Sequence, residues 1–230
     1  MVDQHRVPLD GGLVAEVRFT DAGDGDFRVV DPEPDLEWRR RSIVDRPWSW
    51  IRQVHGSNVL EVAEPGEHAG SEADGLITTA VGCPVAVTTA DCAPVVLLAG
   101  SGLAVVHAGW RGLLAGIVEL AGSRLRELGG PPRGTLLGPC IGPGAYRFGT
   151  AELEPIVGRF GQAVRSTTTD GEPALDLSAA VAKACEAVGW PAPEPPACTS
   201  GPRWFSHRTR AEQSRQTAVA WLTRDGRIDG

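Results

Sequence analysis

The chain has 230 residues, of which 42% are hydrophobic and 22% are charged, and its formal net charge is −7 at neutral pH. This length and composition suit one folded domain with a sizeable core. The acidic balance leaves no basic surface for a nucleic-acid backbone or an anionic membrane. We therefore expect a small-molecule partner, no nucleic acid and no membrane.

The first segment, the longest uncharged stretch and the cysteines indicate where in the cell the protein is expected. The first segment, "MVDQHRVPLD", lacks the apolar run of a signal peptide. The longest uncharged stretch, residues 92–110, is broken by Gly-Ser-Gly and does not read as a membrane span. The five cysteines form no CxxC pair, which favours reduced thiols and a cytoplasmic protein.

The first 47 residues are polar and rich in turns, and only "DPEPDLEWRRRSIVDRPW" predicts a short helix there. "WSWIRQVHGSNVLEVA" then predicts a strand, a turn at Gly56 to Asn58, and a second strand. Four runs rich in Val, Leu, Ile and Thr follow, namely "ADGLITTA", "CPVAVTTA", "APVVLLAG" and "GLAVVHAG". We expect these runs to be the buried strands of one central sheet.

After Trp110 the apolar spacing changes to that of a helix ending at Gly129 and Gly130. Its apolar side is formed by Leu113, Ile117, Leu120 and Leu128. "TLLGPCIGPGAYRFG" predicts a strand that runs into a glycine-rich loop.

Two further helices are predicted, one from an N-cap at Thr150 to Phe160 and one from an N-cap at Ser178 to a stop at Gly189. The proline-rich residues 191–196 could be a linker, but "TAVAWLT" predicts a strand after them. Residues 1–230 are therefore expected to form a single domain of mixed α/β (α+β) class, with layered β-sheets flanked by helices.

Three residues at the ends of apolar runs carry the chemistry: His55, Cys92 and His107. Small residues flank them, so a ligand could approach the backbone. Two imidazoles and a thiolate, with a fourth position open, are the ligand set of a catalytic zinc. Their spacing matches no zinc finger, and a buried thiol with two core histidines would give the same pattern without a metal.

Seven segments, in order, resemble the motifs of the bacterial laccase-domain proteins. They are "QVHGSNV", "ADGLITTAVGCPVAVTTADCAPVVLL", "VVHAGWRGLLAGIVE", "GPCIGPGAYRFG", "LDL", "CT" and "FSHR". This family, also called multicopper polyphenol oxidoreductase, includes purine nucleoside phosphorylases with adenosine deaminase activity. The resemblance implies layered sheets with outer helices. It also implies that His55, Cys92 and His107 are metal-binding and catalytic residues lining a nucleoside pocket.

The amino-terminal part, residues 1–47, departs from the family pattern. "FTDAGDG" has Asp21 and Ala22 where the family tends to show a Thr-Arg pair before a Gly-Gly turn. "DLEWRRR" has Trp38 before Arg39 where the family has Asn-Arg. If those family residues touch substrate, the substrate or the activity of this chain differs.

The metal is constrained by composition. A type 1 copper centre with a three-copper cluster uses about ten histidines, whereas the chain has five. A multicopper oxidase of that kind is excluded. We expect zinc, and the same ligands would also take up copper, which stands above zinc in the affinity order.

Four residues beside the metal candidates are assigned to substrate or support. Arg111, near the start of a helix, and Arg208, in "FSHR", are candidates for binding phosphate, although both could be paired surface charges. Trp110 could stack on a base. Asp91 could form a hydrogen bond to a metal ligand and orient it, or it could simply end a strand.

Several functions follow from these residues. The first is a metal-dependent purine nucleoside phosphorylase and adenosine deaminase acting on adenosine, inosine and related nucleosides, with phosphate as co-substrate. The alternatives are a copper-dependent polyphenol oxidase and a cysteine hydrolase of cell-wall peptides, with Cys92 as nucleophile and His107 as base. A ligand-binding protein without turnover also fits the altered amino-terminal part.

Overall fold

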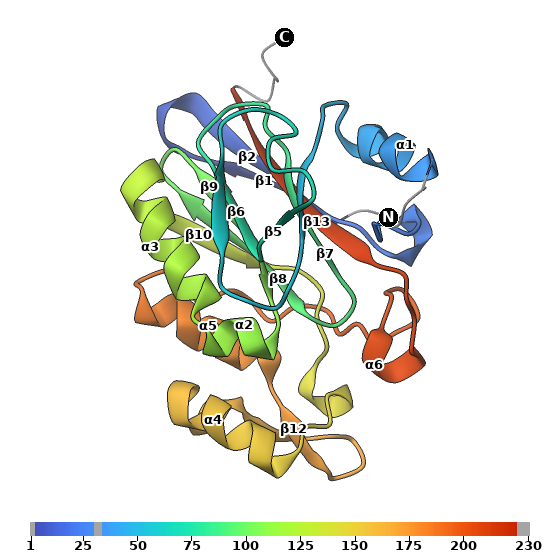
Figure 1. Cartoon of the computed structure of the whole chain (residues 1–230). Coiled ribbons are helices and arrows are strands. Elements are labelled where there is room, and N and C mark those ends of the chain that lie inside the picture. Colours follow the sequence, from blue (N-terminus) through green and yellow to red (C-terminus); the bar gives the residue numbers. More distant parts are fainter. Residues whose placement is uncertain (1–2, 30–33, 225–230) are drawn as a thin grey trace.

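The structure is a computed structural model that describes residues 3–29 and 34–224. Figure 1 shows its sheets at the centre and its helices on the outside. The six-stranded sheet has the order β1 (Asp3–Pro8), β2 (Leu13–Phe19), β13 (Gln216–Arg224), β7 (Val85–Thr89), β3 (Ser49–Arg52), β5 (Ser71–Glu72). The five-stranded sheet has the order β10 (Pro132–Leu137), β8 (Ala93–Ala99), β9 (Leu103–Ala108), β6 (Gly75–Thr78), β4 (Val59–Val62). A small sheet pairs β11 (Arg165–Thr167) with β12 (Pro173–Leu175).

Within the described residues, six α-helices accompany the strands: α1 (Pro34–Ile43), α2 (Trp110–Leu114), α3 (Ile117–Gly129), α4 (Thr150–Phe160), α5 (Leu177–Ala187) and α6 (His207–Arg210). In Figure 1, α2, α3 and α5 lie along the five-stranded sheet, and α1 lies on the opposite side of the molecule. The expected mixed α/β single domain with layered sheets and flanking helices is confirmed.

The strand β8 shows how the layers are held together. Val96 and Leu98 pack into the core between the two large sheets, whereas Val95 and Leu97 pack into the core beneath the helices. Because both faces of the strand are covered, its sequence is a continuous apolar run and does not alternate with polar residues. A third core, around Trp48 and Trp221, lies on the other face of the six-stranded sheet and includes Leu36 of α1.

The prediction of one central sheet was wrong. The run that forms β7 belongs to the six-stranded sheet, whereas β6, β8 and β9 belong to the five-stranded sheet. The predicted strand, turn and strand around Gly56 to Asn58 are present, and the connection passes from β3 in the six-stranded sheet to β4 in the five-stranded sheet. An apolar run reveals that a strand is buried but not which strand it pairs with.

The helix after Trp110 also differs from the prediction. Gly116, at φ 83°, ends one helix and starts the next, so the chain forms α2 and α3. The buried side of α3 includes Val118 and Gly122, and Leu120 and Leu128 are therefore 41% and 40% exposed.

The N-caps lie one or two residues before the predicted ones. Gly149 precedes α4 in the place predicted for Thr150. Asp176 caps α5 in place of Ser178, because its carboxylate accepts the backbone N–H of Ala179 at 2.9 Å. The polar amino-terminal part contains the strands β1 and β2, which its turn-rich sequence did not predict.

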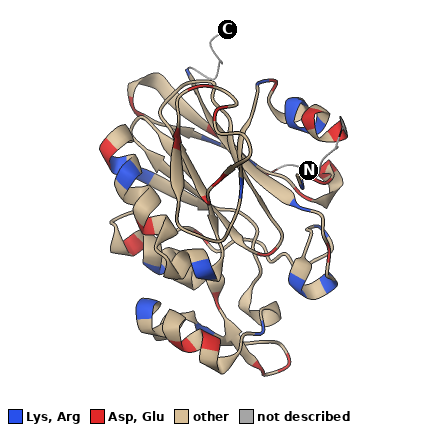
Figure 2. Ribbon diagram, viewed as in Figure 1, with Lys and Arg blue, Asp and Glu red and all other residues tan. Residues whose placement is uncertain are grey.

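Charged residues are spread over the outside of the molecule. Figure 2 shows acidic and basic residues interspersed on the outer helices, with few of either on the two large sheets. Within the described ranges, no helix has both the length and the apolar character needed to cross a membrane.

We predict that Leu97→Ala lowers the free energy of unfolding by about 2–5 kcal/mol, because it leaves a cavity in a close-packed core. Leu97 is fully buried in β8. Leu128→Ala, on the exposed side of α3, is the control and should change stability by less than about 1 kcal/mol. Urea unfolding of both variants measures the difference, and equal losses would contradict the layered packing.

Candidate metal and substrate site

Three separate parts of the chain bring His55, Cys92 and His107 together. His55 follows β3, Cys92 lies in the turn between β7 and β8, and His107 is near the end of β9. One ligand atom from each lies within 4.8 Å of the others. The Cys92 Sγ is 3.9 Å from the His55 Nε2, and the two imidazole rings have centroids 4.8 Å apart. The three predicted residues therefore form one cluster that could hold a metal ion.

The backbone around the cluster is shaped to let these side chains meet. His55 and Asp91 have φ of 59° and 91°, values that side-chain-bearing residues rarely adopt. At Gly109, a Cβ would lie 3.0 Å from the His55 Cδ2 and 3.1 Å from the Cys92 Sγ. Only glycine fits at that position without displacing a member of the cluster.

Asp74 is the residue that holds the cluster in place, and the sequence did not single it out. Its side chain is fully buried, directly before β6. The Oδ1 atom lies 2.8 Å from the His107 Nδ1 and accepts the His55 N–H at 2.9 Å, and Oδ2 accepts the Gly56 N–H at 2.7 Å. An acidic residue just before an apolar strand, as in "EADGLIT", was the available signal.

The charge state of Asp74 fixes the tautomer of His107. Burial alone would raise the pKa of the Asp74 carboxyl, but its hydrogen bonds to His107 and to the backbone of Gly56 and His55 lower that pKa overall. The ionised carboxylate therefore accepts a proton-bearing Nδ1, which leaves the His107 Nε2 for the cluster.

Cys92 and His107 favour each other's charged form. Burial opposes both charges, but the positive charge and hydrogen bond of His107 lower the pKa of the Cys92 thiol to about 6. The Cys92 thiolate and Asp74 in turn raise the pKa of His107. In the absence of metal, the arrangement is a thiolate beside an imidazolium near neutral pH.

The cluster lies in the wall of a cavity of about 750 Å³, which is also lined by Trp110, Arg111 and Arg208. The Arg111 guanidinium lies over the ring of Trp110, 4.4 Å from its centroid. The Arg208 guanidinium lies over the ring of Tyr146 at 5.0 Å. Neither arginine forms an ion pair with a described acidic residue. The predicted substrate residues therefore keep guanidinium groups without a described carboxylate partner in the cavity that also contains the metal candidates.

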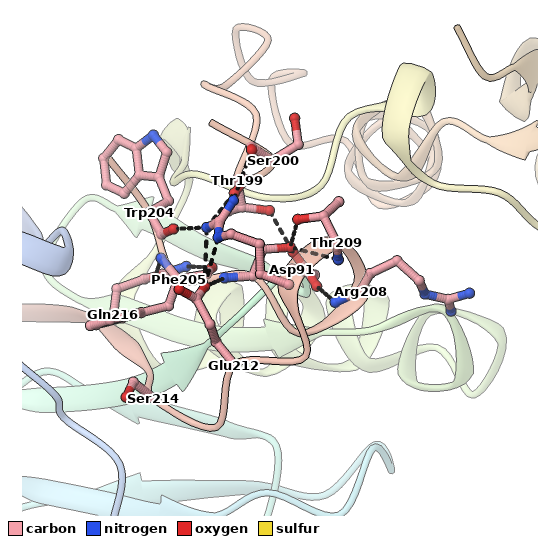
Figure 3. A network of polar contacts seen from close by, with 12 residues as sticks. Asp91, Thr199, Ser200, Trp204, Phe205, Arg208, Thr209, Glu212, Ser214 and Gln216 are labelled. Carbon is pink, nitrogen blue, oxygen red and sulfur yellow. Dashed lines mark hydrogen bonds and ion pairs between the residues drawn. The ribbon is translucent and has the colours of Figure 1, made fainter. Parts of the chain in front are cut away.

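Asp91 also lines the cavity, but its carboxylate bonds to the carboxyl-terminal segment. It accepts hydrogen bonds from the Thr199 Oγ1 at 2.6 Å, the Ser206 Oγ at 2.7 Å and the Arg208 N–H at 2.6 Å. Figure 3 shows Asp91 facing Thr199 and the backbone of Arg208, whose side chain points away from this network. Asp91 thus fixes the backbone that carries Arg208 to the turn that carries Cys92.

Sequence reasoning missed several residues of the cavity wall, among them Arg28, Trp50 and Arg215. Each lies in a polar connection or on a mixed strand, so no motif marks it. The positions that depart from the family pattern, Asp21, Ala22 and Trp38, are not among the lining residues. Asp21 caps a short helical turn and binds Arg203, and Trp38 is 71% exposed.

A known protein family and several curated proteins match most of this chain. The family model described as multi-copper polyphenol oxidoreductase laccase matches residues 24–223. Purine nucleoside phosphorylase Rv2149c of Mycobacterium tuberculosis is 35% identical over 179 residues, covering 75% of this chain and 71% of the relative. Purine nucleoside phosphorylase PA4543 of Pseudomonas aeruginosa is 32% identical, covering 94% of this chain and 92% of the relative.

Solved structures agree on the fold. YlmD from Geobacillus stearothermophilus has a TM-score of 0.76 at 24% identity, covering 94% of this chain and 93% of that one. The YfiH protein of Bacillus licheniformis has a TM-score of 0.78 at 20% identity, covering 92% and 93%. The resemblance read from the seven motifs is confirmed: this chain belongs to the multi-copper polyphenol oxidoreductase laccase family, in which its curated relatives are named purine nucleoside phosphorylases.

Proposed function

We propose that this protein is a metal-dependent purine nucleoside phosphorylase that also deaminates adenosine, acting on adenosine, inosine and related nucleosides. The observation that carries the proposal is the convergence of His55, Cys92 and His107 in the wall of a 750 Å³ cavity. A cavity of this size suits a small organic ligand. The names of the curated relatives support the phosphorylase activity.

The donor set fits zinc. Two imidazole nitrogens and a thiolate are borderline and soft ligands of the kind that zinc prefers, and three protein ligands leave a coordination position for chemistry. The lowered pKa of the Cys92 thiol supplies the thiolate form that binds metal. Bound zinc would supply Lewis-acid polarisation and an activated water. Copper would bind the same donors, with higher affinity in the general order.

The remaining cavity residues would bind and orient the substrate. Trp110 offers an aromatic face for a purine, and Arg111 and Arg208 offer guanidinium groups that fit phosphate. Asp74 keeps a proton on the His107 Nδ1, and so holds the imidazole in one orientation through the reaction.

A second candidate function rests on the same side chains. Cys92, His107 and Asp74 form a thiolate, imidazole and carboxylate series of the kind that cysteine hydrolases use. A copper-dependent polyphenol oxidase has less support, because the described residues gather only one cluster of three His, Cys or carboxylate donors. The metal content of the purified protein distinguishes the metal-dependent phosphorylase from the cysteine hydrolase.

We expect protein purified without added metal to contain zinc, and Cys92→Ser and His107→Ala each to lose it while staying folded. Cys198→Ser is the matched control, because Cys198 is a partly exposed thiol outside the cluster. Elemental analysis gives the zinc content, and circular dichroism verifies folding. Wild-type protein without zinc would contradict the hypothesis that the cluster binds zinc.

The zinc-loaded protein should cleave inosine only when phosphate is present, and should convert adenosine to inosine without phosphate. Asp74→Asn should slow both reactions about 10- to 100-fold, because partners of metal-binding histidines contribute on that scale. Chromatography of bases and nucleosides measures both products in one sample. If the wild type shows neither activity, the hydrolase or the ligand-binding function gains support.

In metal-free protein, alkylation of Cys92 by iodoacetamide should rise through a midpoint near pH 6, because only the thiolate reacts. Burial raises the pKa of Cys83, Cys140 and Cys185, so these thiols should stay unmodified at that pH. Peptide mass mapping identifies the labelled site, and Cys92→Ser gives the background. A midpoint near the ordinary thiol value of about 8.5 would contradict the thiolate–imidazolium pair.

A further inference from the structure

The cavity wall carries much more positive charge than the chain as a whole. Five arginines line it, and Asp91 is the one described carboxylate among the lining residues. Both Asp91 side-chain oxygens are occupied by Thr199, Ser206 and the Arg208 backbone. In a protein of net charge −7, this concentration of guanidinium groups indicates an anionic ligand.

The five arginines differ in their surroundings. Arg52, Arg111 and Arg208 are exposed to solvent, and Arg52 is already paired with Glu72 at 2.8 Å. Arg28 and Arg215 are half-buried. A charge that is partly removed from water requires a partner more than an exposed one does, so these two arginines are of special interest.

Arg28 and Arg215 are held side by side through Asp26 and Phe27. The Asp26 Oδ1 accepts the backbone N–H of Arg28 at 2.8 Å and that of Arg215 at 2.9 Å. The Phe27 N–H bonds to the Arg215 carbonyl at 2.9 Å, and the Phe27 ring is stacked on Trp48 in the core. Two segments far apart in the sequence are thereby fixed to each other.

Their charges are only partly compensated. Asp26 supplies one negative charge for two guanidinium groups, and its Oδ2 stays 3.9 Å from the Arg28 Nε. That Nε is buried and has no hydrogen-bond partner in the described chain. The Thr89 hydroxyl is the other such buried side-chain atom among the described lining residues. Unsatisfied buried donors of this kind call for a ligand or an ion.

Arg215 is rigidly presented. Its Nη1 donates to the carbonyls of Glu212, Gln213 and Ser214, between 2.8 and 3.3 Å. Its Nε and Nη2 have no hydrogen bond to a described residue. Burial lowers the pKa of Arg215, and the charge of Arg28 acts in the same direction. A bound anion would relieve both effects.

We propose that Arg28 and Arg215 form a subsite for a phosphate dianion in this cavity, distinct from Arg111 and Arg208. The proposal rests on the proposed function only for the identity of the ligand. The dianion is either inorganic phosphate, the co-substrate of phosphorolysis, or the 5′-phosphate of a purine nucleotide, and planar guanidinium forks suit both.

The first experiment measures binding to the zinc-loaded protein without turnover. Calorimetry with inorganic phosphate alone, and with IMP against inosine in the absence of phosphate, compares wild type, Arg28→Ala and Arg52→Ala. Among the described residues, the Arg28 guanidinium forms one ion pair, with its Nε 3.9 Å from the Asp26 Oδ2. Truncation of the side chain should therefore leave the protein folded. Arg52 is the matched control, because it lines the same cavity but already has Glu72 as partner.

We expect Arg28→Ala to weaken phosphate binding, or the binding of IMP but not of inosine, about 10- to 100-fold, as hydrogen bonds to charged groups contribute. Arg52→Ala should change neither by more than about twofold. Loss of affinity for inorganic phosphate identifies the co-substrate, and loss for IMP alone identifies a nucleotide phosphate. Unchanged affinity for both ligands would overturn the subsite.

Arg215→Lys is the second variant, because it keeps the charge and removes the planar fork. Arg215→Ala would also remove the bonds to three carbonyls and could unfold the loop. Arg215→Lys should weaken the binding of the same ligand as Arg28→Ala does. If only Arg208→Ala lost affinity for that ligand, the assignment to Arg28 and Arg215 would be overturned. Phosphate binding that depends on Arg28, without cleavage of any nucleoside, would keep the subsite and reject the phosphorylase.

Discussion

The buried carboxylate of Asp74 is the constraint on which the site depends. Removing a carboxylate from water is costly unless hydrogen bonds compensate it, and here one imidazole and the backbone N–H groups of residues 54–56 do so. The Asp74 carbonyl also accepts the His107 N–H at 2.8 Å. One residue thus ties the loop after β3, the start of β6 and the end of β9 together. The positions of His55 and His107 both follow from it.

The two-sheet arrangement explains why the cluster lies where strands of both large sheets end. The chain leaves β7 in one sheet and enters β8 in the other, so the turn between them spans both layers. Cys92 lies in that turn, and Asp91 secures it to the carboxyl-terminal segment. Because Asp91 also binds the Arg208 backbone, the thiol and a cavity arginine are positioned by one side chain.

The sequence predicted most of the elements and the three clustered residues, for identifiable reasons. Thiol and imidazole side chains at the ends of apolar runs are unusual, so His55, Cys92 and His107 stood out. Asp74 did not, because a single carboxylate before a strand also fits an ordinary turn. The sheet partners of β7 could not be predicted from periodicity, since burial on both faces erases the alternation that marks a face.

Helix ends and the cavity wall were harder still. Asp176 and Ser178 are both good caps, and only the three-dimensional bond to the Ala179 N–H distinguishes them. Arg28 and Arg215 lie in polar connections at opposite ends of the chain, where arginine is common on any surface. Their proximity is a product of the sheet order, which local patterns do not encode.

The position of β13 has a consequence for how the protein is made. This last strand lies between β2 and β7, and the β1–β2 pair joins the sheet only through it. Until β13 has been synthesised, the amino-terminal strands have no place to dock in the sheet. The six-stranded sheet is therefore completed late, by slow long-range pairing. The bonds that secure Asp91, next to Cys92, form only once the segment from Thr199 to Arg208 has been made, whereas the Asp74 contacts to His55 and His107 need no part of that segment.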